Sequence, residues 1–168
     1  MNDTVQIETK ISFDYLTDFL LSDYHERRNH TSLGVYGEQY AKRLLLDSGY
    51  LALKGNLTPF SGDLRTIDTQ TFTETHVEVK TAYCSATGGY SFCLKKQGKT
   101  DICHSDYAIL ICIDRYLNHY VYCIHCNLIK NQSLKIPTHP NNYAGKYAPF
   151  LVRQNINFDD TRKVAALW

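Results

Sequence analysis

Two acidic residues and a lysine in the first half of the sequence have the types and spacing needed for metal-assisted chemistry on a phosphate. Asp63 precedes one alternating apolar stretch, and Glu78 and Lys80 lie two residues apart in the next. If the turn between them is centred between residues 70 and 71, antiparallel partners have numbers that sum to 141. Asp63 then lies opposite Glu78, with Cβ atoms about 5 Å apart, and Lys80 points to the same face. One hairpin is therefore predicted to bring two carboxylates and an ammonium group together.

This trio predicts a metal-assisted reaction at phosphorus. Two opposed carboxylates repel each other, and a divalent cation between them reverses the sign of that interaction. Carboxylate oxygens are the hard ligands that Mg²⁺ prefers, and Mg²⁺ usually keeps several waters. A coordinated water can be oriented for attack on phosphorus, and the Lys80 ammonium can stabilise charge that grows on the phosphate. Phosphodiester hydrolysis is the chemistry that these parts match.

Two strands and a short turn must position these side chains. Alternating apolar residues predict strands over 64–67 and 72–82. One face of this hairpin is apolar and is expected to pack against a helix; it carries Leu64, Val77 and Val79. The other face is polar and carries the three candidate site residues together with Arg65, Glu74 and His76.

Further elements are predicted on both sides of the hairpin. Apolar residues at helical spacing predict helices over 11–24 and 33–48, and Gly49 is a natural end for the second. Additional strands are expected over 50–53, 90–94, 106–113, 120–124 and, beyond several loops, 149–152. The continuous apolar run 106–113 is typical of a strand buried on both faces. These elements predict a mixed α/β domain with one central sheet.

The order of these elements resembles the PD-(D/E)XK, or restriction-endonuclease-like, nuclease superfamily over roughly residues 33–113. Residues 61–64 (SGDL) stand where the family has its Pro-Asp, with Gly62 in place of the frequent proline. Residues 77–80 (VEVK) match the Glu-x-Lys strand. The helix that contains residues 37–41 (GEQYA) resembles the family helix that often presents a glutamate to the metal site.

The resemblance implies a fold, a cofactor and a set of site residues. The fold would be α/β, with a mixed central β-sheet flanked by helices. Asp63, Glu78 and the backbone carbonyl of Val79 would bind Mg²⁺, for which Mn²⁺ could substitute. Lys80 would assist catalysis, and Glu38 would support the site as a further catalytic residue.

Four more residues are candidates for accessory roles. Gln97 loosely matches a polar position that some family branches use, and Lys95, Lys96 and Arg65 are candidate contacts to a nucleic-acid backbone. Each also has a structural interpretation, because charged residues alternate on any exposed strand. For Arg65, an exposed cross-strand pair with His76 is the alternative.

The function that the resemblance implies is a Mg²⁺-dependent DNA endonuclease of the restriction, homing, resolvase or repair type. A homodimer or larger homo-oligomer is expected, because a duplex has two strands to cut. One alternative is a catalytically silent nucleic-acid-binding module on the same fold. Another is an unrelated α/β protein that binds a partner through its tyrosine-rich C-terminal half.

The 168 residues are expected to form one core with two extensions. The predicted boundaries are 1–32 for an N-terminal helical extension, 33–130 for the nuclease core and 131–168 for a C-terminal extension that recognises substrate or a second subunit. Phosphate contacts from this last part of the chain could come from Lys130, Lys135, Lys146 and Arg153, beside stacking tyrosines.

Composition predicts an intracellular protein, cytoplasmic or nucleoid-associated, without a membrane anchor. No apolar run approaches the roughly 18–20 residues that cross a bilayer, and the first ten residues lack the apolar part of a signal peptide. The net charge of +1 leaves room for a local basic face but not for a polybasic chain. Six cysteines are expected to be reduced; Cys123 and Cys126 supply only two of the four ligands of a zinc site.

Overall fold

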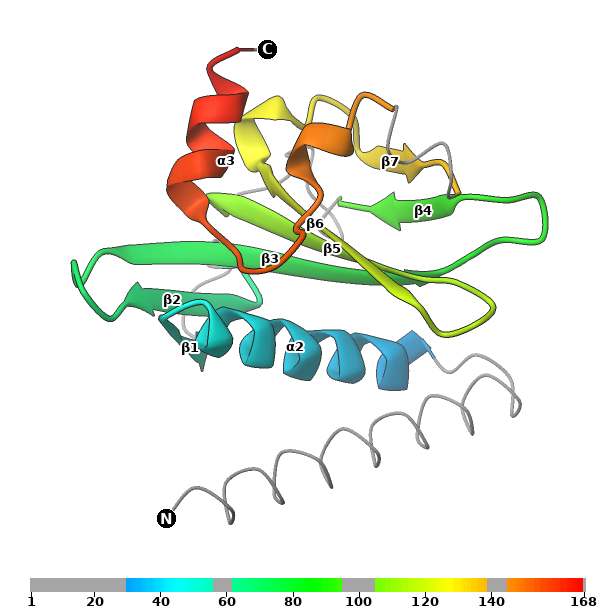
Figure 1. The fold of residues 1–168 in the computed structure, drawn as a ribbon. Helices are drawn as coiled ribbons and strands as arrows, with labels where there is room; N and C mark the ends of the chain where they lie inside the picture. The colour runs from blue at the N-terminus through cyan, green and yellow to red at the C-terminus, as the bar shows by residue number, and fades with distance from the viewer. Residues whose placement is uncertain (1–29, 56–61, 95–104, 139–144, 168) are drawn as a thin grey trace. The chain divides into compact units, whose positions relative to one another are not determined.

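The computed structural model describes residues 30–55, 62–94, 105–138 and 145–167, with side chains from residue 33 onward. The chain divides into two compact units, Met1–Tyr36 and Gly37–Trp168. Its elements in chain order (Figure 1) are α2 (His30–Asp47), β1 (Tyr50–Lys54), β2 (Leu64–Asp68), β3 (Glu74–Tyr83), β4 (Tyr90–Cys93), β5 (Tyr107–Ile113), β6 (His119–His125), η1 (Cys126–Leu128), β7 (Ser133–Ile136), η3 (Ala148–Phe150) and α3 (Phe158–Ala165). The helix expected over 11–24 lies outside the described residues. In the described part, no helix has the length and apolar character needed to traverse a lipid bilayer.

The central sheet has five strands in the order β1-β2-β3-β5-β6, and β4 pairs with β7 in a separate two-stranded sheet. Within the central sheet β3 and β5 are parallel, and the other neighbours are antiparallel. The connection from β3 to β5 passes through β4, so the small sheet is an excursion between two adjacent central strands (Figure 1). The predicted mixed sheet with flanking helices is confirmed.

The β2–β3 hairpin has the predicted register. Leu64 pairs with Val77 and Arg65 with His76, so the numbers of paired residues sum to 141. Local turn chemistry explains this register, because Asp68 Oδ1 accepts hydrogen bonds from the backbone N–H groups of residues 70 (2.7 Å) and 71 (2.9 Å). These bonds, the one from residue 71 first, lower the pKa of the Asp68 carboxyl. The alternation of faces along β2 and β3 follows from this register.

One face of the sheet is covered by helices. Helix α2 ends at Gly49, whose φ of 89° is a left-handed conformation that favours glycine. Gly37 lies so close to Thr81 that an added Cβ would overlap the threonine hydroxyl, and the Tyr40 ring stacks on His119 with centroids 4.7 Å apart. Helix α3 covers the same face, where the Phe158 ring lies 4.5 Å from that of Tyr107.

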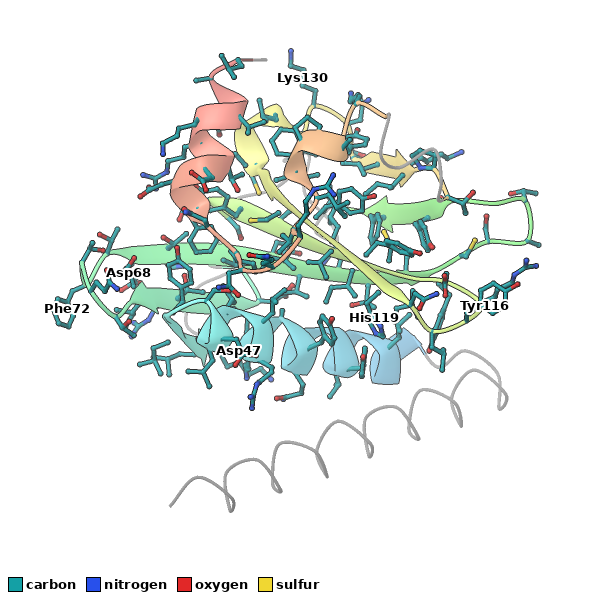
Figure 2. All side chains as sticks on the ribbon, viewed as in Figure 1. Asp47, Asp68, Phe72, Tyr116, His119 and Lys130 are labelled. Atoms are coloured by element: carbon teal, nitrogen blue, oxygen red, sulfur yellow. The ribbon has the colours of Figure 1, made fainter. Side chains whose placement is uncertain are left out.

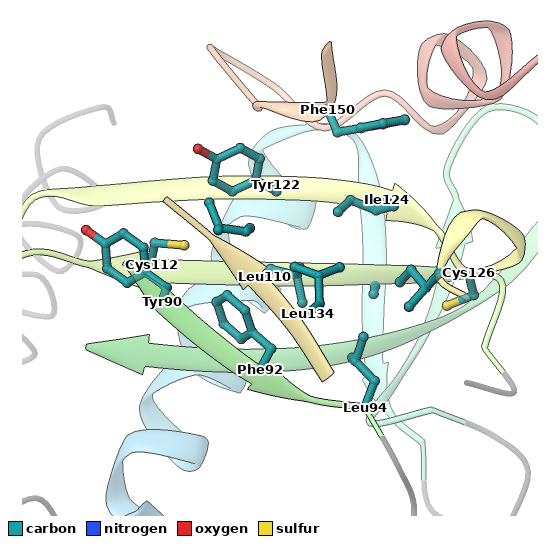
Figure 3. Close-up of a cluster of buried hydrophobic side chains, with 13 residues drawn as sticks. Tyr90, Phe92, Leu94, Leu110, Cys112, Tyr122, Ile124, Cys126, Leu134 and Phe150 are labelled. Carbon is teal, nitrogen blue, oxygen red and sulfur yellow. The ribbon is translucent and has the colours of Figure 1, made fainter. Parts of the chain in front are cut away.

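The opposite face of β5 and β6 packs against the small sheet. Alternate residues of the two central strands meet side chains of β4, β7 and η3 in one buried cluster, shown in Figure 3. Its members include Phe92, Leu110, Tyr122, Leu134 and Phe150. All seven residues of β5 are buried, so the prediction of a strand buried on both faces is confirmed.

Three predictions for the last third of the chain were wrong or missing. The strand expected over 149–152 is the 3₁₀ helix η3 followed by a single bridge from Leu151 to Tyr122. Pro149 favours the first turn of a helix and cannot donate to a strand ladder. Strand β7 and helix α3 were not predicted, although Asn157 is a typical N-cap that accepts from the N–H groups of Asp159 and Asp160. Because β7 and α3 pack on the other elements, the expected boundary at 130/131 falls inside the second compact unit.

Candidate active site

Asp63 is held at the start of β2 by two backbone hydrogen bonds. Its carbonyl oxygen accepts from the N–H of Gly55 at the end of β1 (2.9 Å). Its side-chain Oδ2 accepts from the N–H of Val79 on β3 (2.8 Å). The carboxylate therefore completes the hydrogen bonding of β3 at the point where β2 has not yet begun, and it is anchored from both neighbouring strands.

The two predicted carboxylates and the lysine meet in space. The Lys80 Nζ lies 2.5 Å from Glu78 Oε1 and 3.8 Å from Asp63 Oδ2. The Glu78 side chain is only 7% exposed, whereas those of Asp63 and Lys80 are about one third exposed, at 31% and 32%. A nearly buried carboxylate needs such a partner, because an unpaired buried charge is strongly unfavourable. The cluster carries a net charge of −1 and opens to solvent on the side of Asp63 and Lys80.

The backbone of Val79 contributes to the same place. In an extended strand the N–H and C=O groups of one residue point to the same side, which is why paired residues exchange two hydrogen bonds. The Val79 N–H points toward Asp63, so its carbonyl oxygen faces the same edge of β3. Two carboxylates and one carbonyl oxygen are thus presented from adjacent chain segments.

This donor set fits Mg²⁺. The contacts described above use Asp63 Oδ2 and Glu78 Oε1, which leaves the second oxygen of each carboxylate to a further ligand. Mg²⁺ is commonly bound by one or two carboxylates while its other positions are filled by waters and substrate phosphates. Asp63 and Glu78 would hold it, with the carbonyl oxygen of Val79 as a third donor.

Two glycines make the approach of these segments feasible. An added Cβ at Gly62 would lie 2.5 Å from the carbonyl oxygen of Val77 and closer still to the Ser105 hydroxyl. A Cβ at Gly55 would overlap the carbonyl oxygen of Gly62. The backbone just before Asp63 therefore packs directly on two neighbouring segments. Gly62, which stands where the family often has proline, is the sequence signal for this requirement, but its partner at position 105 is not visible in the sequence.

The polar face continues along the hairpin toward its turn. Arg65 Nε lies 3.7 Å and His76 Nε2 lies 3.3 Å from Glu74 Oε1. Arg65 and His76 are also direct cross-strand partners. The expected structural pairing of Arg65 is therefore present, on the same face as the candidate active site.

The structure does not bring Glu38 together with the two carboxylates. In the described part of the chain, no three His, Cys, Asp or Glu side chains are grouped so that they could hold a metal ion. Glu38 follows Gly37, which packs on Thr81, and Thr81 points to the face of β3 opposite to Lys80. The sequence predicts the helix that carries Glu38, but only the packing of that helix decides which face of the sheet it covers.

The other predicted residues separate into two groups. Lys95, Lys96 and Gln97 lie outside the described residues. Cys123 and Cys126 are both free and buried; the Cys123 thiol contacts Thr161 of α3 and has a pKa raised to about 12 by burial. Cys126 instead belongs to the cluster on the other face of the sheet, so the two thiols lie on opposite faces.

Comparisons with known proteins bear on this fold. No family model matches the chain. It is 31% identical over 78 residues to a UPF0102 protein of Treponema pallidum, found in two strains of which one is Nichols. The match covers 46% of this chain and 62% of each relative, so the chain spans less than two thirds of their length.

A solved structure gives the fold. The chain is similar to a bacterial homing endonuclease, I-Ssp6803I, with a TM-score of 0.58 and 18% sequence identity. The likeness covers 83% of this chain and 97% of that one. The chain has the restriction-endonuclease-like fold that its sequence predicts.

Proposed function

We propose that this protein is a Mg²⁺-dependent DNA endonuclease that hydrolyses phosphodiester bonds at Asp63, Glu78 and Lys80. The observation that carries this proposal is the position of the Lys80 ammonium within 4 Å of both carboxylates, at an open edge of the sheet. The fold that the chain shares with a homing endonuclease supports the choice of a nuclease and of DNA as the substrate.

Each residue has a separate role in the proposed reaction. Asp63 and Glu78 bind and orient the cation, and the hydrogen bond from the Val79 N–H keeps the Asp63 carboxylate turned toward the site. Mg²⁺, when bound, would neutralise phosphate charge and activate a water for in-line attack. Lys80 donates hydrogen bonds to the phosphate oxygens on which negative charge grows. Because Lys80 is held by Glu78, its ammonium is positioned before the substrate arrives.

A plasmid-nicking assay tests the proposal. Supercoiled DNA is incubated with wild-type protein and with Asp63→Asn, Glu78→Gln and Lys80→Ala variants, in Mg²⁺ or in EDTA. We expect nicking by the wild type in Mg²⁺ only, and a loss of at least roughly 100-fold in each variant, the effect typical of removing one group that stabilises a transition state. Mn²⁺ is expected to restore activity after EDTA treatment.

The matched control is Asp47→Asn, because Asp47 is a carboxylate paired with a basic residue, Arg43, on an exposed helix surface. This variant should nick DNA at the wild-type rate. Circular dichroism of every variant separates lost chemistry from lost folding. DNA binding without nicking by the wild-type protein would contradict the proposal and favour the catalytically silent binding module.

We propose further that the active form is a homodimer or a larger symmetric assembly. A duplex has two strands of opposite polarity, and a twofold assembly presents one site to each of them. Light scattering with and without a short duplex measures the assembly. A monomer that cuts both strands in one binding event would contradict this part of the proposal.

Glu38 is retained as a supporting residue that acts from helix α2. Since it is not grouped with Asp63 and Glu78, we expect Glu38→Gln to reduce nicking less than Asp63→Asn does. Equal losses in the two variants would indicate that Glu38 reaches the reacting groups when the substrate is bound.

A further inference from the structure

A cavity of about 590 Å³ lies beside the small sheet, at the edge formed by β7. Three chain segments line it: residues 128–131 after η1, residues 133–135 of β7, and residues 146–147 before η3. Among these described lining residues three are lysines, namely Lys130, Lys135 and Lys146, and none is acidic. The segments are joined only by the fold, so the cavity is a feature of the tertiary structure.

The charge at this cavity differs from that of the whole chain. The protein has a net charge of only +1, with 18 basic and 17 acidic residues. Most other basic groups discussed above are matched by acids, as in the pairs that Arg43 and Lys163 form with aspartates. In the described part of the chain neither Lys130 nor Lys135 has an ion-pair partner. Three like charges around one hollow repel each other, so this arrangement does not serve stability.

The walls of the cavity favour an anion with oxygen ligands. Leu128, Ile129 and Leu134 supply apolar surface, which strengthens the field of nearby charges. The side chains of Asn131 and Ser133 can donate hydrogen bonds. Lysine ammonium groups act as compact point charges for phosphates.

The ring of Tyr147 has a different role. Lys146 Nζ lies 5.1 Å from the centroid of the Tyr147 ring, in a cation–π contact. This contact holds the lysine at the rim and occupies a face of the ring. The cavity is therefore suited to phosphate groups rather than to stacking of a base on Tyr147.

The cavity lies on the same side of the central sheet as the candidate active site. Lys80 is the register partner of Leu110 on β5, so both side chains point to one face. Leu110 packs in the cluster formed with β4 and β7 (Figure 3). A polyanion bound over Lys80 can thus continue along the small sheet toward the lysines, of which Lys130 is labelled in Figure 2.

We propose that this cavity binds phosphates of the DNA backbone away from the cleaved bond, through Lys130, Lys135 and Lys146. The identity of the polyanion rests on the proposed nuclease function, whereas the existence of an anion site rests on the cavity and its lysines. The contacts would position the duplex without reading its sequence, as backbone contacts generally do.

Fluorescence anisotropy with a labelled duplex tests this proposal in EDTA, where no cleavage occurs. The Lys130→Gln/Lys135→Gln double variant is compared with Lys42→Gln/Lys163→Gln, which removes the same charge from two helices. We expect the first pair to weaken binding roughly tenfold and to reduce the slope of log Kd against log salt by about 1.8, that is about 0.9 for each lost phosphate contact. The second pair should behave as wild type. Lys146→Gln is measured separately, because this lysine also contacts Tyr147.

Equal affinities and salt slopes for the two double variants would overturn the proposal. Inorganic phosphate, at the same total phosphate concentration as the duplex, is expected not to displace the DNA; displacement would assign the cavity to a free anion and overturn the assignment to DNA. The proposed function fails independently. A protein that never nicks DNA but loses binding in the Lys130→Gln/Lys135→Gln variant retains this inference, whereas one that nicks DNA with unchanged binding in that variant does not.

Discussion

The ammonium of Lys80 lies between two carboxylates that would otherwise face each other without a counter-charge. Glu78 is nearly buried and holds the lysine, whereas Asp63 is more exposed and is oriented by the backbone of Val79. The two acids are therefore not equivalent. Glu78 is pre-organised by burial and charge, and Asp63 depends on the close packing of the backbone around it.

This dependence leads to a prediction for Gly62. Gly62→Ala should destabilise the fold by about 1–3 kcal/mol, the usual cost of inserting a methyl group into a packed region, and should lower nicking by displacing Asp63. Gly34→Ala is the matched control, because nothing lies within 4 Å of an added Cβ at that helical position. The control should gain about 0.5–1 kcal/mol and keep its activity. Thermal unfolding and the nicking assay measure both effects; wild-type activity in Gly62→Ala would contradict the positioning role.

The turn of the β2–β3 hairpin exposes a strained aromatic residue. Phe72 has a φ of 57° and a side chain that is 79% exposed, and Figure 2 shows it at the tip of the hairpin beside Asp68. A left-handed conformation costs a non-glycine residue about 1–2 kcal/mol. The surrounding turn, closed by the Asp68 carboxylate, imposes this conformation.

Phe72→Asn is therefore expected to raise the free energy of unfolding by about 0.5–1 kcal/mol, because asparagine tolerates the left-handed region. Chemical denaturation measures the change. Tyr116→Asn is the control: Tyr116 is also an exposed aromatic in a turn, at 70%, but it has no positive φ. A gain of the same size in the control would mean that removing exposed apolar surface, rather than relieving strain, explains the effect.

Helix α2 and strand β6 meet through the stacked rings of Tyr40 and His119. Burial lowers the pKa of His119 from its usual value of 6.5, although Asp114 and a backbone hydrogen bond act in the opposite direction. The neutral imidazole is thus the form that this contact requires.

A pH dependence of stability follows from this shift. The unfolded chain binds a proton at His119 near pH 6.5, and the folded protein does so only at lower pH, so stability is lost as the pH falls below 6.5. His119→Phe keeps an aromatic ring and should reduce this loss between pH 6.5 and the lowered pKa. Thermal unfolding from pH 5 to pH 8 tests this, with Tyr40→Phe as a control that retains the histidine. Identical pH profiles for His119→Phe and the wild type would contradict the assignment.

The whole molecule couples metal binding to folding stability. Asp63 and Glu78 come from different strands, so a cation that needs both of them binds the folded state and not the unfolded chain. The stabilisation expected at a Mg²⁺ concentration 100 times its Kd is about 2.7 kcal/mol. Calorimetry should show a rise in Tm with Mg²⁺ in the wild type and not in Asp63→Asn. An equal rise in both proteins would place the cation elsewhere.

The distribution of charge also acts across the whole molecule. Acids and bases are nearly balanced overall, and yet the candidate active site is acidic and the cavity beside β7 is basic. The acidic site attracts the cation, and the basic cavity attracts the polyanion. This division allows a nearly neutral protein to hold both ligands on one side of its sheet.

The amino-acid sequence was sufficient for features that depend on neighbours along the chain. The register of β2 and β3, and with it the meeting of Asp63, Glu78 and Lys80, follows from the alternation of apolar residues and from a turn closed by Asp68. Contacts between distant segments required the three-dimensional arrangement, because no local pattern encodes which surfaces meet. The face on which α2 carries Glu38, the packing of Gly62 on Ser105, and the gathering of lysines from three segments around one cavity are all of this kind.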